Sequence, residues 1–348
     1  MTQVRALAAP APSAKFESTT IERRELRPED VRIEIDYAGI CHSDTHQARN
    51  EWREGIFPMV PGHEIVGRVV EVGSDVTKFA VGDLAGVGVM VDSCGECEYC
   101  LDGRENVCLR GNVQTYNGRY YDGTPTYGGY SREIVVKESF VLNVPSSLDL
   151  AAAAPLLCAG ITVYLPLRDW GAAPGKRVAV LGIGGLGHLG VKIAAAMGAE
   201  VTALGRSEAK RADALAFGAN EYLVTTDPGF FTDNRNRFDV ILNASSADLD
   251  VDSLLDTLRV GGALVNVGLP GNRQSFDPFS VVGGMKSISG SNTGGIRDTQ
   301  EMLDFCAQHG ITADIELIEG RPELIDEAYD RMVASDVRYR FVIDAKTI

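Results

Sequence analysis

The strongest constraint on the fold is a glycine motif that lies between a buried strand and a helix. Residues 178–181 are apolar, GIGGLG follows in the pattern G-x-G-x-x-G, and the next residues have helical composition. The first glycine permits a tight turn, the second allows close approach of a pyrophosphate, and the third lets helix and strand pack closely. Amides at the helix start then face the anion. This order predicts a dinucleotide site, and a glycine-rich turn without a ligand is the alternative; the motif residues are Gly182, Gly184, Gly185, Leu186 and Gly187.

The motif stands in a regular alternation of strands and helices that begins near residue 148. Helical stretches such as DLAAAAPLLCAGITVYLPLRDW, GLGHLGVKIAAAMG, SEAKRADALAFG and DLDVDSLLDTLRVG separate the strands RVAVLG, EVTALG, EYLVTT, FDVILNAS, ALVNVG and KSISGSN. Such alternation predicts a parallel sheet that helices cover on both faces. We therefore predict an α/β protein with a doubly wound dinucleotide-binding domain over residues 158–295.

The remaining chain predicts a second, mostly β domain. Short strands such as VRIEIDYAG, EIVGRVVEVGSDV, DLAGVGVM and YSREIVVKE alternate with turns before residue 157. The segment after residue 295 exceeds what the parallel sheet needs, so we assign residues 1–157 and 296–348 to this domain. A chain of 348 residues is long enough for two cores.

The charge of the chain excludes some classes of partner. Its formal net charge is −15, which opposes binding to nucleic acid or to an anionic membrane surface. The start has no cationic region followed by an apolar stretch, and no apolar run reaches bilayer-spanning length. We expect a cytoplasmic protein with a small-molecule substrate, no nucleic acid and no membrane partner.

The end of the second strand of the dinucleotide domain predicts the cofactor. An NAD site usually places an acidic residue there for the ribose hydroxyls, but this chain has Gly205, followed by Arg206 and Ser207. Arg206 can bind a 2′-phosphate and stack on adenine, Ser207 can donate a hydrogen bond, and Lys210 or Arg211 can complete the pocket. We therefore predict a preference for NADP(H) over NAD(H); the alternative is that these cations only solvate a helix start.

Four of the seven cysteines form a compact motif, DSCGECEYCLDGRENVC. Its thiols match a closed tetrahedral zinc site, which leaves no open position for chemistry and is structural. An iron–sulfur cluster is the alternative from thiol count. The four residues are Cys94, Cys97, Cys100 and Cys108.

A second constellation is dispersed over GICHSDTH, PGHEIVGRVVEVG and PLLCAGIT. Taken singly, Cys41, His63 and Cys158 are ordinary packed residues. Together with the motifs above, however, GHEIVGRVVEVGSDV, GICHSDTH and LLCAGITVY resemble the zinc-dependent medium-chain alcohol dehydrogenases. The segments TYNGRYYDGTPTYGGYS, AAAAPLLCAGITVYLPL, GIGGLGHLGVKIAAAMGAEVTALGRSEAKR and KSISGSNTGG resemble the NADP-dependent cinnamyl alcohol dehydrogenase branch.

The resemblance implies a GroES-like catalytic domain, a Rossmann domain and two zinc ions per chain. Cys41, His63 and Cys158 would hold a catalytic zinc, with Glu64 as a near or alternating ligand. Asp44 would orient the His63 ring, Ser43 would bind the substrate oxygen, and His46 would pass the proton to solvent. The remaining cofactor contacts implied are His42, Thr162, Val267, Gly268, Ser289 and Ser291.

The same resemblance implies hydride transfer between NADP(H) and primary alcohols or aldehydes, in a homodimer paired through KSISGSN. Because cells keep their NADP pool reduced, we expect the chain to work as an aldehyde reductase. A medium-to-large aliphatic or aromatic substrate is expected. Three alternatives stay open: a polyol or secondary-alcohol dehydrogenase, a zinc-independent quinone or enoyl reductase, and a non-catalytic NADPH-binding zinc protein. Candidate pocket residues are Trp52, Tyr116, Ile296 and the surroundings of Met90 and Asn292.

Overall fold

The computed structural model describes residues 2–348 and divides the chain into two compact units. Unit 1 comprises Met1–Cys158 and Gly294–Ile348, and unit 2 comprises Ala159–Thr293. These boundaries lie one residue after the predicted 157/158 division and two residues before the predicted 295/296 division, so Cys158 belongs to unit 1. The functional assignment of the two domains stays a prediction.

Unit 1 is built on a seven-stranded sheet in which strands far apart in the sequence pair. The order is β16-β17-β3-β4-β5-β9, and β8 also pairs with β3; β16 and β17 are parallel and the other pairs are antiparallel. Two hairpin-like pairs, β1-β2 and β6-β7, accompany the sheet. The strands are β1 Thr2–Ala8, β2 Glu17–Arg23, β3 Asp30–Ile40, β4 Ile65–Val72, β5 Leu84–Val87, β6 Met90–Asp92, β7 Val113–Gln114, β8 Glu133–Lys137, β9 Leu142–Asn143, β16 Ile315–Glu319 and β17 Arg340–Asp344.

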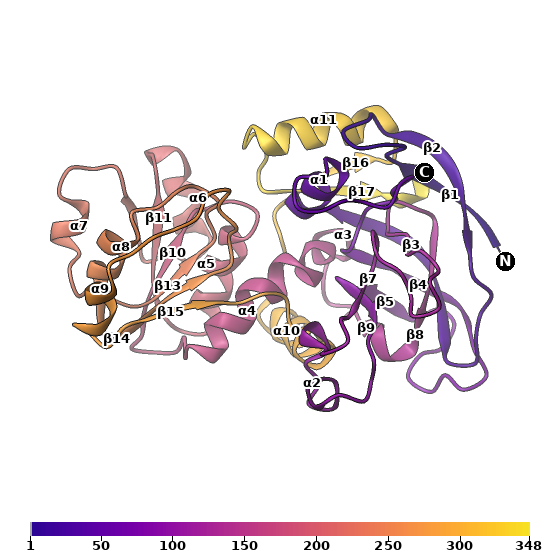
Figure 1. The fold of residues 1–348 in the computed structure, drawn as a ribbon, viewed down its shortest axis with the longest axis horizontal. Helices are drawn as coiled ribbons and strands as arrows, with labels where there is room; N and C mark the ends of the chain where they lie inside the picture. Colours follow the sequence, from indigo (N-terminus) through magenta and orange to yellow (C-terminus); the bar gives the residue numbers. More distant parts are fainter. Residues whose placement is uncertain (1) are drawn as a thin grey trace. The chain divides into compact units, whose positions relative to one another are not determined.

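The helices of unit 1 are mostly short, and the C-terminal strand β17 joins the central strand β3, as Figure 1 shows. One core of apolar side chains from the strands and from α11 holds the unit together. The helices are α1 His42–Ala48, α2 Glu98–Leu101, η1 Glu105–Val107, η2 Glu138–Phe140, α3 Leu150–Ala153, η3 Ala154–Leu157, α10 Ile296–His309, α11 Pro322–Val333 and η5 Ala345–Thr347.

Unit 2 is a six-stranded sheet in the order β12-β11-β10-β13-β14-β15, and every pair is parallel. Counted within the unit, this order is 3-2-1-4-5-6, the arrangement of dinucleotide-binding sheets. The carboxyl ends of the strands therefore meet at one edge. The strands are β10 Arg177–Leu181, β11 Glu200–Gly205, β12 Glu221–Val224, β13 Phe238–Asn243, β14 Leu258–Asn266 and β15 Ser287–Gly290.

Helices cover both faces of this sheet, as the sequence predicts. Alternate residues of β10 point to opposite faces: Ala179 joins a cluster with Phe230 of α7 and Leu254 of α8, whereas Val180 faces Gly190 of α5. The doubly wound fold class is confirmed. The helices are α4 Ala159–Asp169, α5 Gly187–Ala196, η4 Glu208–Lys210, α6 Arg211–Ala216, α7 Phe230–Asp233, α8 Val251–Thr257 and α9 Pro278–Val282.

Two expected helices differ from the structure. The helix expected through residue 261 ends at Thr257, because Leu258 is extended and pairs with Phe238 of β13. The helical stretch expected over residues 149–170 is divided into α3, η3 and α4, with Cys158 at the break between η3 and α4. Pro155 has no backbone N–H, which disfavours one continuous helix.

Within residues 2–348, no single helix has the length and apolar composition needed to cross a bilayer. Two consecutive helical segments with a bend between them, Leu150–Leu157 and Ala159–Asp169, are together long and apolar enough, by length and composition only.

Candidate active site and cofactor site

The turn between β3 and α1 places the first candidate ligand. Cys41 directly follows the buried end of β3 and is the N-cap of α1. Its backbone N–H donates to Asp44 Oδ2 at 2.8 Å, which fixes the turn. The Cys41 thiol is therefore presented at the end of a central strand.

The next candidate ligand, His63, is oriented by a carboxylate. His63 Nδ1 lies 3.1 Å from Asp44 Oδ1, and because an ionised carboxylate only accepts, Nδ1 is the donor. In the neutral ring the other nitrogen, Nε2, then carries no proton and is suited to bind a metal. Gly62 has φ +103°, and a Cβ there would lie 2.7 Å from the Tyr130 ring, so the close turn before His63 requires glycine.

Four candidate donor groups converge although they are distant in the sequence. The ligand atoms of Cys41, His63, Glu64 and Cys158 all lie within 4.8 Å of one another. Two thiols and one imidazole form a donor set that zinc prefers, and three protein ligands leave a position for water or substrate. The residues present therefore fit a catalytic zinc ion. Their assignment as ligands stays a prediction.

Glu64 is held by an arginine that the sequence analysis missed. Arg340 Nη2 donates to Glu64 Oε1 at 2.6 Å and to Oε2 at 2.7 Å, and it also donates to the Ile40 carbonyl at 2.8 Å. Burial raises the pKa of Glu64 to about 7, although Arg340 opposes the shift. The one signal in the sequence was an arginine in the apolar strand segment RFVID.

The two thiols of the set differ in acidity. The hydrogen bond between them lowers the pKa of the Cys41 thiol well below its usual range and raises that of the Cys158 thiol. Burial by itself would lower the pKa of His63, but the Asp44 carboxylate raises it well above the usual value. A thiolate in this pair is therefore stabilised by the neighbouring thiol.

Buried tyrosines surround Asp44, and the sequence analysis did not single out Tyr130. Tyr130 Oη donates to Asp44 Oδ2 at 3.2 Å, and Tyr329 Oη donates to Tyr130 Oη at 3.4 Å. Tyr116 stacks on the His63 ring, with 5.7 Å between the ring centroids, and accepts a hydrogen bond from Gln47. Tyr116, a candidate pocket residue, is thus buried beside a candidate ligand.

The proton-relay candidates lie on α1. Ser43 Oγ is 3.4 Å from Cys41 Sγ, next to the donor cluster. His46 Nδ1 contacts Glu51 Oε2 at 2.5 Å, and the half-buried His46 ring stacks on the exposed Trp52 at 4.8 Å. This arrangement leaves His46 Nε2 as the nitrogen that is not bound by Glu51.

The four clustered cysteines meet as the spacing predicts. The ligand atoms of all four lie within 4.8 Å of one another, and Cys100 Sγ is 3.5 Å from Cys97 Sγ and 3.8 Å from Cys94 Sγ. A tetrahedron with zinc–sulfur bonds of about 2.3 Å has sulfur–sulfur edges of about 3.8 Å. The spacing favours one ion, since an iron–sulfur cluster holds its thiolates on different iron atoms. Cys108 completes the set. Backbone N–H groups, first that of Leu109, lower the pKa of Cys97 to about 6.

Three glycines of the dinucleotide motif differ in the local geometry that calls for glycine. Gly182 has φ +88°, a Cβ on Gly187 would lie 1.9 Å from the Gly182 carbonyl oxygen, and a Cβ on Gly184 would meet no described atom within 4 Å. Gly187 is therefore required for the strand–helix contact, and Gly184 leaves its surroundings open to a ligand. Gly185 and Leu186 complete the turn before α5.

After β11, some side chains are exposed to solvent and others form hydrogen bonds or ion pairs within unit 2. Arg206 and Ser207 are exposed directly after the strand end at Gly205. Lys210 Nζ donates to the Ile183 carbonyl of the dinucleotide motif at 2.7 Å. Arg211 contacts Glu208 and donates to the Tyr222 carbonyl at 2.7 Å, so its guanidinium already has partners within unit 2.

The remaining predicted cofactor residues lie in both units. In unit 2, four follow or belong to the carboxyl ends of strands, the edge that binds ligands in such sheets, and Thr162 lies on α4. In unit 1, burial lowers the pKa of His42 on α1. Of the pocket candidates, Met90 is buried in the unit 1 core, Ile296 packs against that core, and Asn292 is exposed. The four strand-end residues are Val267, Gly268, Ser289 and Ser291.

A Rossmann-type sheet together with a Cys/His donor set and a four-cysteine site defines a zinc-binding dehydrogenase. Residues 27–146 match the family described as alcohol dehydrogenase GroES-like domain, and residues 185–308 match the zinc-binding dehydrogenase family.

Three similar proteins span the whole chain. It is 58% identical to the probable formaldehyde dehydrogenase AdhA of Bacillus subtilis, with 99% of each chain covered. It is 53% identical to the NADP-dependent alcohol dehydrogenase C 1 of Mycolicibacterium smegmatis, over 100% of this chain and 99% of the relative. A cinnamyl alcohol dehydrogenase of Sorghum bicolor superposes with a TM-score of 0.95 at 41% identity, covering 99% of this chain and 98% of the other. The chain therefore belongs to the zinc-binding alcohol dehydrogenase family, and the predicted family and the GroES-like plus Rossmann fold are confirmed.

Proposed function

We propose that this chain is an NADP(H)-dependent zinc oxidoreductase that interconverts primary alcohols and aldehydes and acts chiefly as an aldehyde reductase. The observation that carries the proposal is the convergence of Cys41, His63 and Cys158 beside Ser43. The relatives named as an NADP-dependent alcohol dehydrogenase and a cinnamyl alcohol dehydrogenase support the cofactor and the substrate class. The reductive direction rests on the reduced state in which cells keep their NADP pool.

The chain's own residues orient the substrate and move its proton. Zinc, when bound by the two thiolates and His63, supplies a Lewis acid that polarises the substrate oxygen, and NADP(H) supplies or accepts the hydride. Asp44 holds the His63 ring through Nδ1. In the reductive direction the Ser43 hydroxyl binds the substrate oxygen and gives it a proton, and His46, whose ring is partly exposed, replaces that proton from solvent; oxidation of an alcohol moves the proton the opposite way.

The test of this function combines metal content with activity. We expect two zinc ions per purified chain and faster oxidation of NADPH than of NADH with benzaldehyde, cinnamaldehyde or hexanal. Formaldehyde, a polyol and a ketone complete the panel, and higher activity with the polyol or ketone would replace the proposed substrate class. Turnover that persists after zinc removal would point to a zinc-independent reductase, and tight NADPH binding with no turnover to a binding protein.

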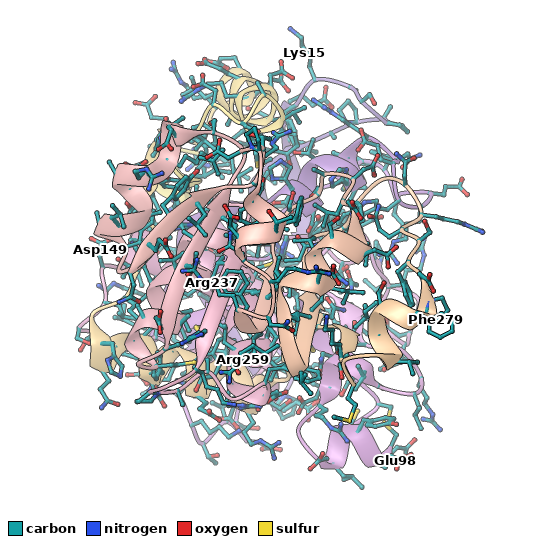
Figure 2. The ribbon with its side chains drawn as sticks, turned by 90° about the vertical axis from the view of Figure 1, so that its left-hand side faces the viewer. Lys15, Glu98, Asp149, Arg237, Arg259 and Phe279 are labelled. Carbon is teal, nitrogen blue, oxygen red and sulfur yellow. The ribbon has the colours of Figure 1, made fainter. Side chains whose placement is uncertain are left out.

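Arg206 is proposed to bind the 2′-phosphate of NADP(H). Replacing Arg206 with alanine removes a charged hydrogen-bond donor, so we expect the Kd for NADPH to rise about 10- to 100-fold while that for NADH changes little. Arg259→Ala is the matched control, because Arg259 is another exposed arginine of unit 2, paired with Asp239 and labelled in Figure 2. Nucleotide fluorescence titration measures both constants. An equal loss for both cofactors in Arg206→Ala would remove the phosphate assignment.

We also propose a homodimer formed through the edge of the unit 2 sheet. β15 is an end strand, and within residues 2–348 no strand pairs with its outer edge. Exposed apolar side chains lie on and after the neighbouring α9: Phe279 is 82% exposed and Met285 74%. Figure 2 shows the Phe279 side chain at the outside of the ribbon. Exposed strand edges and apolar patches are suited to subunit pairing.

The dimer is tested with a charge in this surface. We expect Phe279→Glu to halve the mass measured by light scattering, because a carboxylate buried at the interface would lose its hydration. Leu101→Glu is the control, since Leu101 is a similarly exposed apolar residue in unit 1. A wild-type monomer, or an unchanged dimer in Phe279→Glu, would contradict the proposal.

A cytoplasmic location is proposed from the state of the cysteines. All seven are free thiols in the structure. Unpaired thiols and thiolate metal sites suit a reducing compartment.

A further inference from the structure

The strand end that carries Gly205 lies against the buried side chain of Tyr222. β11 and β12 are parallel neighbours, in which Ala203 pairs with Tyr222 and Gly205 with Val224. A Cβ built on Gly205 would lie 1.8 Å from Tyr222 Oη and 2.7 Å from Cζ, and real Cβ atoms essentially never come within 3.0 Å of such atoms. The tyrosine ring therefore fills the space that any side chain at position 205 needs.

The Tyr222 ring has little freedom to give way. Tyr222 is only 2% exposed, and its hydroxyl donates to the Ser207 carbonyl at 2.6 Å. The Arg211 guanidinium lies 5.1 Å from the centre of the ring and donates to the Tyr222 backbone carbonyl. A side chain at position 205 would have to displace a buried, hydrogen-bonded ring, which costs much more than moving a flexible surface side chain.

Tyr222 also helps to fix the backbone of the cofactor segment. The Gly205 carbonyl accepts from Thr225 N at 2.8 Å and the Arg206 carbonyl from Thr226 Oγ1 at 3.0 Å. With the Ser207 carbonyl held by Tyr222, all three carbonyls of residues 205–207 are bound from β12 and the turn after it. The exposed side chains of Arg206 and Ser207 are thereby presented in one backbone conformation.

We propose that Tyr222 is a specificity-determining residue for the cofactor. It occupies the place of the acidic side chain that an NAD site carries at the end of the second strand. It also holds the segment that presents Arg206 and Ser207 to the 2′-phosphate. The inference rests on the proposed preference for NADP(H) and deepens it: glycine at 205 is necessary because of Tyr222, and the two positions together determine the cofactor.

The binding test uses Gly205→Asp, Tyr222→Ala and the double variant. In Gly205→Asp we expect NADPH affinity to fall at least about 100-fold, through repulsion of the phosphate and displacement of the segment, while NADH affinity rises less than about 3-fold. In the double variant, loss of the tyrosine ring leaves space for the carboxylate. We therefore expect the double variant to bind NADH about 10-fold more tightly than the Gly205→Asp variant does. Tyr222→Phe, which keeps the ring but not the hydroxyl, should weaken NADPH about 5-fold and leave NADH unchanged.

Two results would overturn the role of Tyr222. The first is Gly205→Asp binding NADH as tightly as the double variant, because the tyrosine would then be no barrier. The second is equal weakening of NADPH and NADH in Tyr222→Phe, which would indicate general damage to the site.

A double-mutant cycle on thermal stability tests the packing between position 205 and Tyr222 in the absence of cofactor. In the zinc-loaded protein, Gly205→Ala should lower Tm by about 4 °C or more when Tyr222 is present, and by less than about 1 °C in the Tyr222→Ala background. Additive effects would contradict the steric argument. If the wild type bound NADH as tightly as NADPH, the proposed cofactor preference would fail and the specificity role with it, whereas coupling in Tm would still show that the packing was described correctly.

Discussion

Replacing Cys158 with serine should lower kcat/KM by about 1000-fold or more and leave the Kd for NADPH within about 3-fold of the wild-type value. The Cys158 thiol lies with the donor atoms of Cys41 and His63, within 4.8 Å of each. A serine hydroxyl is a poor ligand for zinc, which prefers thiolates and imidazole, so the site loses its Lewis acid. The dinucleotide motif belongs to the other unit and keeps its residues. We therefore expect Cys158→Ser to lose turnover and to keep its affinity for NADPH.

Metal analysis and a control cysteine variant show whether the loss of activity comes from the loss of zinc. We expect zinc content to fall from two ions to one per chain in Cys158→Ser. Cys306→Ser is the matched control, because Cys306 is fully buried on α10 and its thiol contacts Met302 outside both candidate metal sites. The control should keep both zinc ions and its turnover. Cys158→Ser with full zinc content and full activity, or with lost NADPH binding, would contradict the ligand assignment.

The local motifs were predictable from the sequence because their geometry is local. The four clustered cysteines span residues 94–108, and the dinucleotide motif joins one strand to the next helix. Chain connectivity alone brings such residues together. The same holds for the strands of unit 2, whose alternation with helices restricts the fold to a parallel sheet.

The dispersed site was predictable only through resemblance. Cys41 and His63 meet because β3 and β4 pair antiparallel, and Cys158 joins them at a break between helices that composition does not locate. Spacing carries no signal for such contacts. Gly205 was identified from the sequence as a missing carboxylate, but its contact with Tyr222 depends on the register between β11 and β12.

Arg340 shows how a determinant of the site escapes sequence reasoning. It lies 276 positions from Glu64 and reaches it because β17 pairs with β3 near Cys41. Arginine on a strand is most often a surface residue, so its sequence context favours solvent. Only the sheet order places it in the interior.

Loss of Arg340 should be the most destabilising single change among the charged residues discussed. Arg340→Met keeps most of the side-chain volume and removes both hydrogen bonds to Glu64, whose side chain is 0% exposed. Removing Arg340 leaves a buried carboxyl that must stay charged without a partner or take up a proton, and either state is costly, so we expect the free energy of unfolding of unit 1 to fall by about 3–5 kcal/mol. Urea denaturation followed by a unit 1 signal measures this loss.

Two further variants separate the buried charge from the loss of packing. Arg340→Met/Glu64→Gln removes both charges, and because a neutral amide costs less to bury than a lone carboxylate, it should recover at least half of the lost stability. Arg321→Met is the exposed control: its side chain is 53% exposed and pairs with Glu319, so the change should stay below about 1 kcal/mol. If the double variant recovered none of the lost stability, packing and the hydrogen bond to Ile40 would account for the role of Arg340. Recovery in the double variant would instead mean that the fold needs Arg340 mainly because the Glu64 carboxyl is buried beside it.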